Sequence, residues 1–375
     1  MLRIAIVGCG KIADDHAECI VDIPGCEIVG VCDRDELMAA QLGLRLGIAR
    51  HYSDVSRLLA EARPEVVHIT TPPQSHYSVG KLCLEAGCHV YVEKPFTVTL
   101  DEAKELLSLA EGRRVNVTVG HNAQFSHCAR RLRALVAAGY LGGPPIHLES
   151  YYSYDLGNAA YAKALLSDHH HWVRNLPGGL LQNTISHGIS KIAEYLTGNR
   201  LAVCAHGFTS GPLRSIGDCE ICDELRVLIH DGTTTAYFTF SSQIRPSLHV
   251  LRIYGSKNGL MMDEQQQTLI KLRGKRYRSY LDQFVPPWQY AGQYIGNSVA
   301  NMRRFLKAEF HARYGMQMLI RSFYNSIIEG GPVPIPYSEI IRTSHIMELI
   351  FSQLRDSELT MVDEGRPTRA LGHRC

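Results

Sequence analysis

The fold is decided by residues 2–13, LRIAIVGCGKIA, in which a short apolar run leads directly into two glycines. The run Ile4–Val7 is bounded by Gly8, as expected of a buried strand. Gly8 and Gly10 allow a tight turn and let backbone amides approach a pyrophosphate, which the N-terminus of the following helix also attracts. Ala13 permits close packing of that helix on the strand. The segment predicts the first strand–helix unit of a dinucleotide-binding domain.

An acid at the end of the next apolar run indicates which dinucleotide binds. Asp33 follows the glycines by roughly twenty residues, where an acid accepts hydrogen bonds from the adenine ribose hydroxyls and repels a 2′-phosphate. Arg34 follows it, and an arginine there either stacks on adenine or pairs with a 2′-phosphate. We therefore expect NAD as the cofactor, with NADP less favoured. The expected contacts in the glycine-rich turn are Gly8, Cys9, Gly10, Lys11 and Ile12.

The first third of the chain alternates short apolar runs with helical patterns. The expected strands are Ile4–Val7, Ile28–Cys32, Val66–Ile69, Val90–Val92 and Val115–Val119. The expected helices are Ala13–Val21, Asp35–Leu46, Val55–Ala62, Tyr77–Ala86 and Asp101–Glu111. This alternation predicts an α/β fold with an N-terminal Rossmann domain, a doubly wound parallel sheet, over residues 1–122.

The pattern changes after the turn-rich segment 139–145. The expected strands are then Ile146–Tyr154, Ala202–Phe208, Glu224–His230, Thr233–Phe240 and His249–Tyr254. They predict a C-terminal α+β domain on a mostly antiparallel sheet, over residues 123–375. Helices at Gly188–Leu196 and Met316–Glu329 are expected to cover one sheet face, and Ser338–Leu354 to pack back near the first domain. Because so few helices leave a face uncovered, we expect a homo-oligomer, a dimer or a tetramer.

The composition excludes several classes of protein. A net charge of +2 gives no field that would recruit nucleic acid or a membrane surface, and the apolar runs fall short of the roughly twenty residues that span a bilayer. Eleven cysteines without a secretory signal before the first strand indicate reduced thiols and a cytoplasmic protein. Cys219 and Cys222 lack a second pair at a zinc-site spacing, and the adjacent histidines 169–171 cannot all face one point, so no metal is expected.

A candidate proton carrier, Lys94, lies directly after the strand Val90–Val92, in the triplet Glu93-Lys94-Pro95. In a doubly wound sheet, ligands bind at the carboxyl ends of the strands. A lysine there, beside an acid, can carry a proton or orient a substrate hydroxyl. The plainer alternative is a surface Lys–Glu pair at a strand end.

Taken together, these segments resemble the glucose–fructose oxidoreductase/inositol dehydrogenase/MocA (Gfo/Idh/MocA) family of sugar and cyclitol dehydrogenases. The resemblance runs over nearly the whole chain. It rests on Gly8-x-Gly10-x-x-Ala13, Thr71-Pro72 followed by His76, Glu93-Lys94-Pro95, Gly120-His-Asn122, and a Gly-Gly segment leading to a histidine. It implies that the nicotinamide lies between the two domains and that the family's lysine is Lys94. The cofactor contacts that it adds are Thr71, Pro72, His76, Glu93, Lys94 and Asn122.

The family's second motif runs from paired glycines to an acid and, four residues later, a histidine. Here it reads GGLLQNTISH, residues 178–187. A spacing of four places Asn183 and His187 on one face of a helix. His187 matches the family's catalytic histidine, but Asn183 stands where many members carry Asp, and an amide cannot take up a proton. The resemblance therefore leaves Lys94 and His187 as the expected acid–base pair, with Asn183 holding a neighbouring hydroxyl.

The loop before this motif is expected to line the substrate pocket. Trp172 offers a flat apolar face to a sugar ring and Arg174 a charged handle, although simple packing or solvent exposure would also explain both residues. The expected substrate contacts are Lys94, Trp172, Arg174, Asn183 and His187.

These features predict an NAD(P)-dependent dehydrogenase that acts on a CH–OH group of a sugar, sugar nucleotide or cyclitol. Three alternatives stay open. The first is a redox-neutral enzyme that uses bound NAD for transient oxidation during epimerisation or elimination. The second is a non-catalytic, nucleotide-sensing regulator on the same fold. The third is a metal-dependent enzyme that uses the histidine run.

Overall fold

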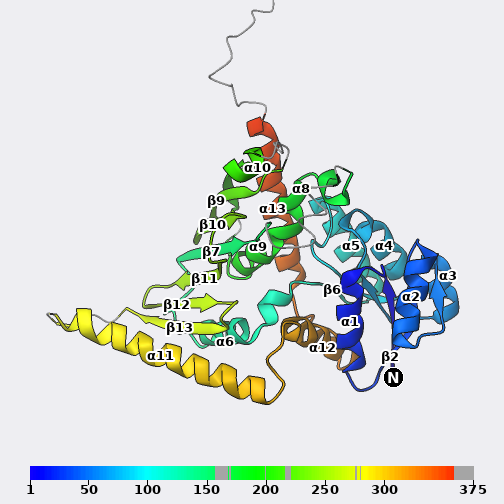
Figure 1. Cartoon of the computed structure of the whole chain (residues 1–375), viewed down its shortest axis with the longest axis horizontal. Coiled ribbons are helices and arrows are strands. Elements are labelled where there is room, and N and C mark those ends of the chain that lie inside the picture. Colours follow the sequence, from blue (N-terminus) through cyan, green and yellow to red (C-terminus); the bar gives the residue numbers. More distant parts are fainter. Residues whose placement is uncertain are drawn as a thin grey trace, which may run out of the picture.

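The computed structural model describes residues 1–156, 168, 170–198, 200–215, 221–274, 277–278 and 280–358. Two sheets with their flanking helices stand side by side, and a long helix projects along the outer edge of the second sheet (Figure 1). Within these ranges, no helix is both long and apolar enough to cross a membrane.

The first sheet is the predicted doubly wound sheet, with six parallel strands in the order β3-β2-β1-β4-β5-β6. Its strands are β1 (Leu2–Val7), β2 (Cys26–Cys32), β3 (His51–Tyr52), β4 (Val66–Ile69), β5 (His89–Val92) and β6 (Val117–Val119). The connecting helices are α1 (Lys11–Val21), α2 (Glu36–Leu46), α3 (Val55–Ala62), α4 (His76–Glu85) and α5 (Leu100–Arg113). The strand order reverses between β1 and β4, which is where such sheets bind a dinucleotide. Of the strands in this first sheet, only the two-residue strand β3 was not predicted.

The second sheet has seven strands in the order β13-β12-β11-β7-β10-β9-β8. They are β7 (His147–Ser153), β8 (Ala202–Phe208), β9 (Glu224–His230), β10 (Thr235–Ser241), β11 (His249–Tyr254), β12 (Asn258–Asp263) and β13 (Thr268–Arg273). Every neighbouring pair is antiparallel except β7 with β10, so the predicted mostly antiparallel sheet is confirmed. On β9, Val227 and Ile229 are buried whereas Leu228 and His230 are exposed, because this sheet has helix cover on one face.

Three helices cover that face and build the second core. They are α6 (His127–Ala137), α9 (Ser186–Ala193) and α13 (Tyr337–Glu358). The cover predicted at Gly188–Leu196 is confirmed, but its helical segment starts earlier, with α8 (Gly179–Thr184) and a break at Ile185. As predicted, α13 reaches the first domain: Ile340 packs in the first core and Ile350 in the second.

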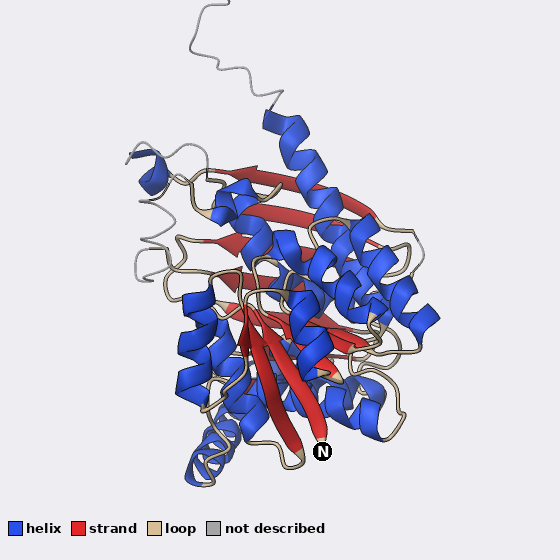
Figure 2. Ribbon diagram, turned by 90° about the vertical axis from the view of Figure 1, so that its right-hand side faces the viewer, coloured by secondary structure: helices blue, strands red, loops and turns tan. Residues whose placement is uncertain are grey.

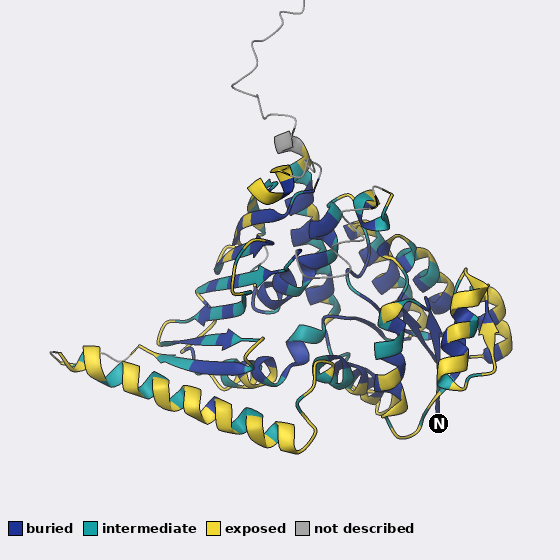
Figure 3. Cartoon of the chain, in the orientation of Figure 1, coloured by how far each residue is buried: buried dark blue, intermediate teal, exposed yellow. Residues whose placement is uncertain are grey.

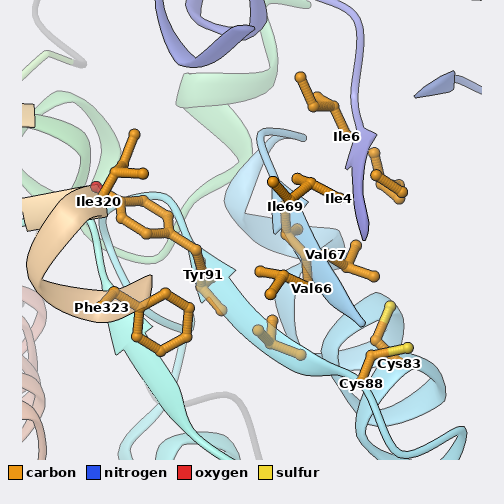
Figure 4. Close-up of a cluster of buried hydrophobic side chains, with 14 of the residues drawn as sticks. Ile4, Ile6, Val66, Val67, Ile69, Cys83, Cys88, Tyr91, Ile320 and Phe323 are labelled. Atoms are coloured by element: carbon orange, nitrogen blue, oxygen red, sulfur yellow. The ribbon is translucent and has the colours of Figure 1, made fainter. Parts of the chain in front are cut away.

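The prediction that the helix near Met316–Glu329 covers the second sheet is wrong. The helix α12 (Tyr314–Ile328) packs on the first sheet instead, with Ile320 and Phe323 beside Tyr91 of β5 (Figure 4). An amphipathic pattern reveals that a helix has an apolar face but not which sheet that face meets. The first core therefore combines residues 1–122 with a segment from the C-terminal third of the chain. In Figure 2, helices flank the strands of the sheet that begins at the N-terminus.

The long helix α11 (Leu281–Leu306) was not predicted, because Pro286 and Pro287 and the glycines at 292 and 296 disfavour a helix. It lies along β13, the edge strand, and uses side-chain amides in place of a neighbouring strand. Asn297 accepts a hydrogen bond from the Leu269 amide (3.3 Å) and donates one to the Leu269 carbonyl (3.1 Å). Gln293 makes the same exchange with Lys271, at 2.7 and 3.2 Å.

The opposite edge of the sheet is closed in the same way. Gln353 of α13 accepts a hydrogen bond from the Ala205 amide of β8 (2.9 Å) and donates one to the Val203 carbonyl (2.7 Å). Both edge strands thus have backbone groups paired with side-chain amides.

Candidate active site

The glycine-rich turn has the shape of a phosphate cradle. Gly8 has a φ of +98°, and a Cβ there would lie 2.5 Å from the Thr71 amide nitrogen, so only glycine fits. Beside Gly10, by contrast, a Cβ would meet no atom within 4 Å. Gly10 is the N-cap of α1, and Lys11 on the first turn is exposed. The open backbone at the start of a helix is suited to a pyrophosphate, and cofactor contact by these residues stays a prediction.

Asp33 joins this turn to the end of β2. Its Oδ2 accepts a hydrogen bond from the Cys9 amide (2.7 Å), and its Oδ1 accepts one from the Asp35 amide (3.0 Å). Its side chain stays partly exposed, and Arg34 beside it is exposed. Burial raises the pKa of the Cys9 thiol to about 12, so that thiol stays neutral. The Asp33 carboxylate therefore lies where the adenine ribose of the cofactor is expected.

His76 ties together two loops at the carboxyl edge of the sheet. The buried ring lies with Nδ1 at 2.9 Å from the Pro95 carbonyl and Nε2 at 2.8 Å from the Thr71 carbonyl. Both ring nitrogens therefore face backbone, which gives His76 a structural role; its contact with a cofactor stays a prediction. Nearby, Pro72 is exposed, and Asn122 accepts a hydrogen bond from the Tyr91 hydroxyl at 2.9 Å.

Glu93 is a buried carboxylate held from two sides. Its Oε2 accepts the Lys94 amide (3.1 Å) and its Oε1 lies 3.0 Å from Nε2 of His16, on α1. Burial alone would raise the pKa of Glu93, but the hydrogen bond with His16 and the charge of Lys94 outweigh it, and the pKa is lowered. Gly120 leaves room for this carboxylate, since a Cβ there would lie 2.6 Å from Oε1.

Beyond His16, buried side chains form a chain of hydrogen bonds. The sequence analysis did not predict this chain. Nδ1 of His16 lies 2.8 Å from Nδ1 of His68, and Nε2 of His68 lies 2.8 Å from the Tyr324 hydroxyl of α12. If His16 donates to Glu93, each further bond can point the same way, from Tyr324 through His68. Burial and His16 hold the pKa of His68 well below 6.5, so this ring is neutral. The chain supports an ionised Glu93 beneath Lys94.

Lys94 and the second motif meet as the sequence predicts. Lys94 Nζ donates to the backbone carbonyl of Asn183 (3.1 Å) and to its Oδ1 (3.3 Å), across the domain junction. Burial lowers the pKa of the Lys94 ammonium, and the charge of Glu93 opposes this only in part. Burial, followed by the charges of Lys94 and other basic groups, holds the pKa of His187 well below 6.5. The lowered pKa makes the free amine of Lys94 accessible at a lower pH than usual, and His187 is neutral at physiological pH.

Lys191 lies four residues after His187, on the same face of the helical segment as Asn183 and His187. It was not predicted as part of the site. Lys191 is 3% exposed and forms an ion pair with Glu264. The centroid of the Tyr152 ring lies 5.7 Å from that of the His187 ring and 4.4 Å from that of the stacked His249 ring. The i, i+4, i+8 spacing could have revealed Lys191, whereas His249 and Glu264 come from distant strands.

Two hollows adjoin this row of side chains. A cleft of about 660 Å³ opens between the domains, with Asn122 on one wall and His249 and Glu264 on the other. A small pocket of about 20 Å³, lined by His121 and Ser186 among others, lies beside Pro95. In the described part of the chain, His121 Nδ1 and Ser186 Oγ have no hydrogen-bond partner, and the pocket has room for one water molecule.

The two other predicted substrate contacts are Trp172 and Arg174. Trp172 is half-buried and packs on a small cluster with Leu180, while its carbonyl accepts a hydrogen bond from Gln74 (2.9 Å). Arg174 lines a separate pocket with residues of α8 and α13. Substrate contact by either residue stays a prediction.

Among the described residues, no three His, Cys, Asp or Glu side chains lie close enough together to hold a metal ion. His169 of the histidine run and Cys219 of the Cys-x-x-Cys pair lie outside the described ranges.

Comparison with known proteins connects this geometry to a family. Residues 2–121 match the Gfo/Idh/MocA family, described as an oxidoreductase family with an NAD-binding Rossmann fold. The chain is 34% identical over 142 residues to a D-glucoside 3-dehydrogenase from Escherichia coli (strain K12), covering 38% of this chain and 40% of that protein. It is 32% identical over 149 residues to a UDP-N-acetylglucosamine 3-dehydrogenase from Acidithiobacillus ferrooxidans, covering 40% and 44%. The matches thus span less than half of each relative.

Solved structures extend the likeness of fold to both domains. The WlbA dehydrogenase from Bordetella pertussis, solved with NADH and UDP-GlcNAcA, superposes with a TM-score of 0.76 at 15% identity, covering 95% of this chain and 96% of that one. The Acidithiobacillus ferrooxidans UDP-N-acetylglucosamine 3-dehydrogenase gives a TM-score of 0.71 at 20% identity, covering 95% and 98%. In residues 2–121, therefore, the chain has the NAD-binding Rossmann domain of the Gfo/Idh/MocA oxidoreductase family.

Proposed function

We propose that this chain transfers a hydride between NAD and a hydroxyl-bearing carbon of a sugar, sugar nucleotide or cyclitol. The observation that carries the proposal is the meeting of Lys94, from the ligand-binding edge of the first sheet, with Asn183 and the adjacent His187 of the second domain. Relatives named as dehydrogenases of a glucoside and of a nucleotide-linked sugar support this substrate class.

In this proposal, bound NAD supplies the hydride acceptor. Lys94 Nζ accepts the alcohol proton during oxidation and returns it during reduction, because its lowered pKa makes the free amine accessible. His187, neutral at physiological pH, hydrogen-bonds the same hydroxyl or its neighbour. Asn183 can both donate to and accept from a further hydroxyl, but it takes no proton.

The choice of NAD over NADP rests on Asp33. Its carboxylate, fixed by the Cys9 and Asp35 amides, would repel a 2′-phosphate. Arg34 is exposed and turned to solvent on the same loop, where it is available to either cofactor.

The test is a panel of sugars, cyclitols and sugar nucleotides incubated with NAD, with the absorbance of reduced nicotinamide as the readout and the Lys94→Ala protein as the control. Lys94-dependent accumulation of NADH with at least one compound is the expected result. Substrate conversion without released NADH would favour the redox-neutral alternative. Binding of ligands without any conversion would favour the regulator and contradict the proposal.

We also infer a homo-oligomer in a reducing compartment. Leu228 and Tyr237 are 43% and 52% exposed on the uncovered face of the second sheet, which supports association through that face. Apart from Cys222, the cysteines in the described ranges are free thiols, which supports the expected cytoplasmic location. A monomer mass by light scattering at micromolar concentration would contradict the oligomer.

A further inference from the structure

The helix α11 is exposed over much of its length (Figure 3), and large apolar side chains are among its exposed residues. Leu281, Trp288, Ile295 and Met302 recur every seven residues and are 53%, 79%, 66% and 66% exposed. The side chains that flank them are also large, apolar and exposed: Phe284, Val299, Phe305 and Leu306. A seven-residue apolar repeat is the pattern with which one helix packs against another.

The apolar stripe that these side chains form faces away from the rest of the chain. Asn297, which holds α11 to β13, and Ile295 are two residues apart, so their side chains point about 200° apart around a helix with 3.6 residues per turn. The polar face of α11 is thus occupied by the sheet edge. The apolar face lies beyond that edge and is separate from the uncovered face of the sheet.

We propose that α11 pairs with α11 of a second copy of this chain, antiparallel, across a twofold axis. The chemistry of the stripe favours a protein partner over a lipid surface. Residues 283–302 contain no Asp, Glu, Lys, Arg or His, whereas helices that lie on membranes carry a polar face rich in Lys and Arg. Aromatic residues and methionine without charges are typical of the buried centre of a protein interface.

The sequence of the stripe is complementary to itself when reversed. A twofold axis between residues 293 and 294 places Leu281 opposite Leu306, Trp288 opposite Val299, and Gly292 opposite Ile295. In the second and third of these pairs, a large side chain faces a smaller one. A Cβ added at Gly292 would meet no atom within 4 Å, so the space for the facing isoleucine is open.

Charge and area agree with this arrangement. The only acid of α11, Asp282, lies on its first turn and Arg303 on its last, so antiparallel pairing brings opposite charges together at both ends. Three of the eight side chains are aromatic, and an aromatic side chain can bury roughly 150–250 Å². Together with the five aliphatic ones, they offer on the order of 800 Å², the usual contribution of one partner to a stable interface.

The first experiment measures mass by sedimentation equilibrium for the wild type, Ile295→Glu and Leu44→Glu. Leu44 is 84% exposed on α2 and serves as the matched control. The wild type is expected at no less than twice the chain mass of 41.9 kDa, Ile295→Glu at half the wild-type mass, and Leu44→Glu unchanged. A monomeric wild type, or an Ile295→Glu protein of full mass, would overturn the proposal. So would a monomeric wild type that sediments with anionic phospholipid vesicles.

The second experiment tests the direction of pairing by mild oxidation of single-cysteine additions, with the wild type and its exposed Cys204 as background. Under the proposed register, two copies of Ile295→Cys lie near the axis and should form an interchain disulfide. Two copies of Leu281→Cys lie about 37 Å apart along the helices and should not. Cross-linking of Leu281→Cys without that of Ile295→Cys would show that the antiparallel register is wrong.

Discussion

Replacing Asn183 by Asp would place a carboxylate 3.3 Å from the Lys94 ammonium, where the amide oxygen now accepts its hydrogen bond. At that distance and an effective dielectric constant of about 20, two unit charges attract by about 5 kcal/mol. The cost of burying the new carboxylate subtracts from this, and an opposite charge so close usually raises the pKa of an amine by about 1–3 pH units. Asn183→Asp should therefore raise the Lys94 pKa, which burial now holds below the ordinary value of 10.5.

The assay follows the labelling rate of Lys94 by an amine-reactive reagent across pH, with the labelled peptide quantified by mass spectrometry. Only the free amine reacts, so the midpoint reports the pKa without any need for substrate. Asn183→Ser is the matched control, because it removes the amide but adds no charge, and the backbone carbonyl of residue 183 still accepts from Lys94. A midpoint for Asn183→Asp at or below that of the wild type would refute the electrostatic reasoning.

Three further predictions follow from the described contacts. Asp33→Ala should narrow the difference in affinity between NAD and NADP in fluorescence titrations, and a wild-type preference for NADP would contradict the assignment. Lys94→Ala and His187→Ala should each lower turnover by a factor of about 10² to 10⁴ with NAD affinity nearly unchanged, so near-full activity of Lys94→Ala would disprove its role as proton carrier. Burial and the nearby charge of Glu194 raise the pKa of Glu339 from 4.5 to about 7. The contribution of protonated Glu339 to the free energy of unfolding is therefore fully present below pH 4.5 and is lost as the pH rises through 7. Urea unfolding should show the wild type losing up to about 3 kcal/mol over that interval relative to Glu339→Gln, and parallel curves would refute this.

The parts of the molecule that were predicted correctly depend on neighbours in sequence. The turn at Gly8 and Gly10 is a local conformation between a strand and a helix, so the residues themselves specify it. The position of Lys94 follows from the rule that carboxyl ends of parallel strands meet at one edge. The spacing of Asn183 and His187 is likewise local, although the break at Ile185 was not foreseen.

The parts that were missed depend on contacts between distant residues. His16 and His68 are 52 positions apart and His68 and Tyr324 are 256 apart, so no spacing rule links them. The raised pKa of Glu339 results from burial that exists only in the folded chain. For α11, prolines and glycines argued against a helix, and the decisive stabilisation comes from amides that bind an edge strand.

The closure of both edges of the second sheet has a consequence for solubility. An unpaired edge strand is a template on which another extended chain can add, and this is a common start of cross-β aggregation. The side-chain amides of Gln293 and Asn297 hydrogen-bond the backbone of the edge strand β13, and that of Gln353 hydrogen-bonds the backbone of the edge strand β8. An added chain would need these same backbone groups. A Gln293→Leu, Asn297→Leu protein should therefore bind thioflavin and precipitate on mild warming under conditions where the wild type stays clear. If it stays equally clear, those amides serve packing alone and the exposed strand is protected by other means.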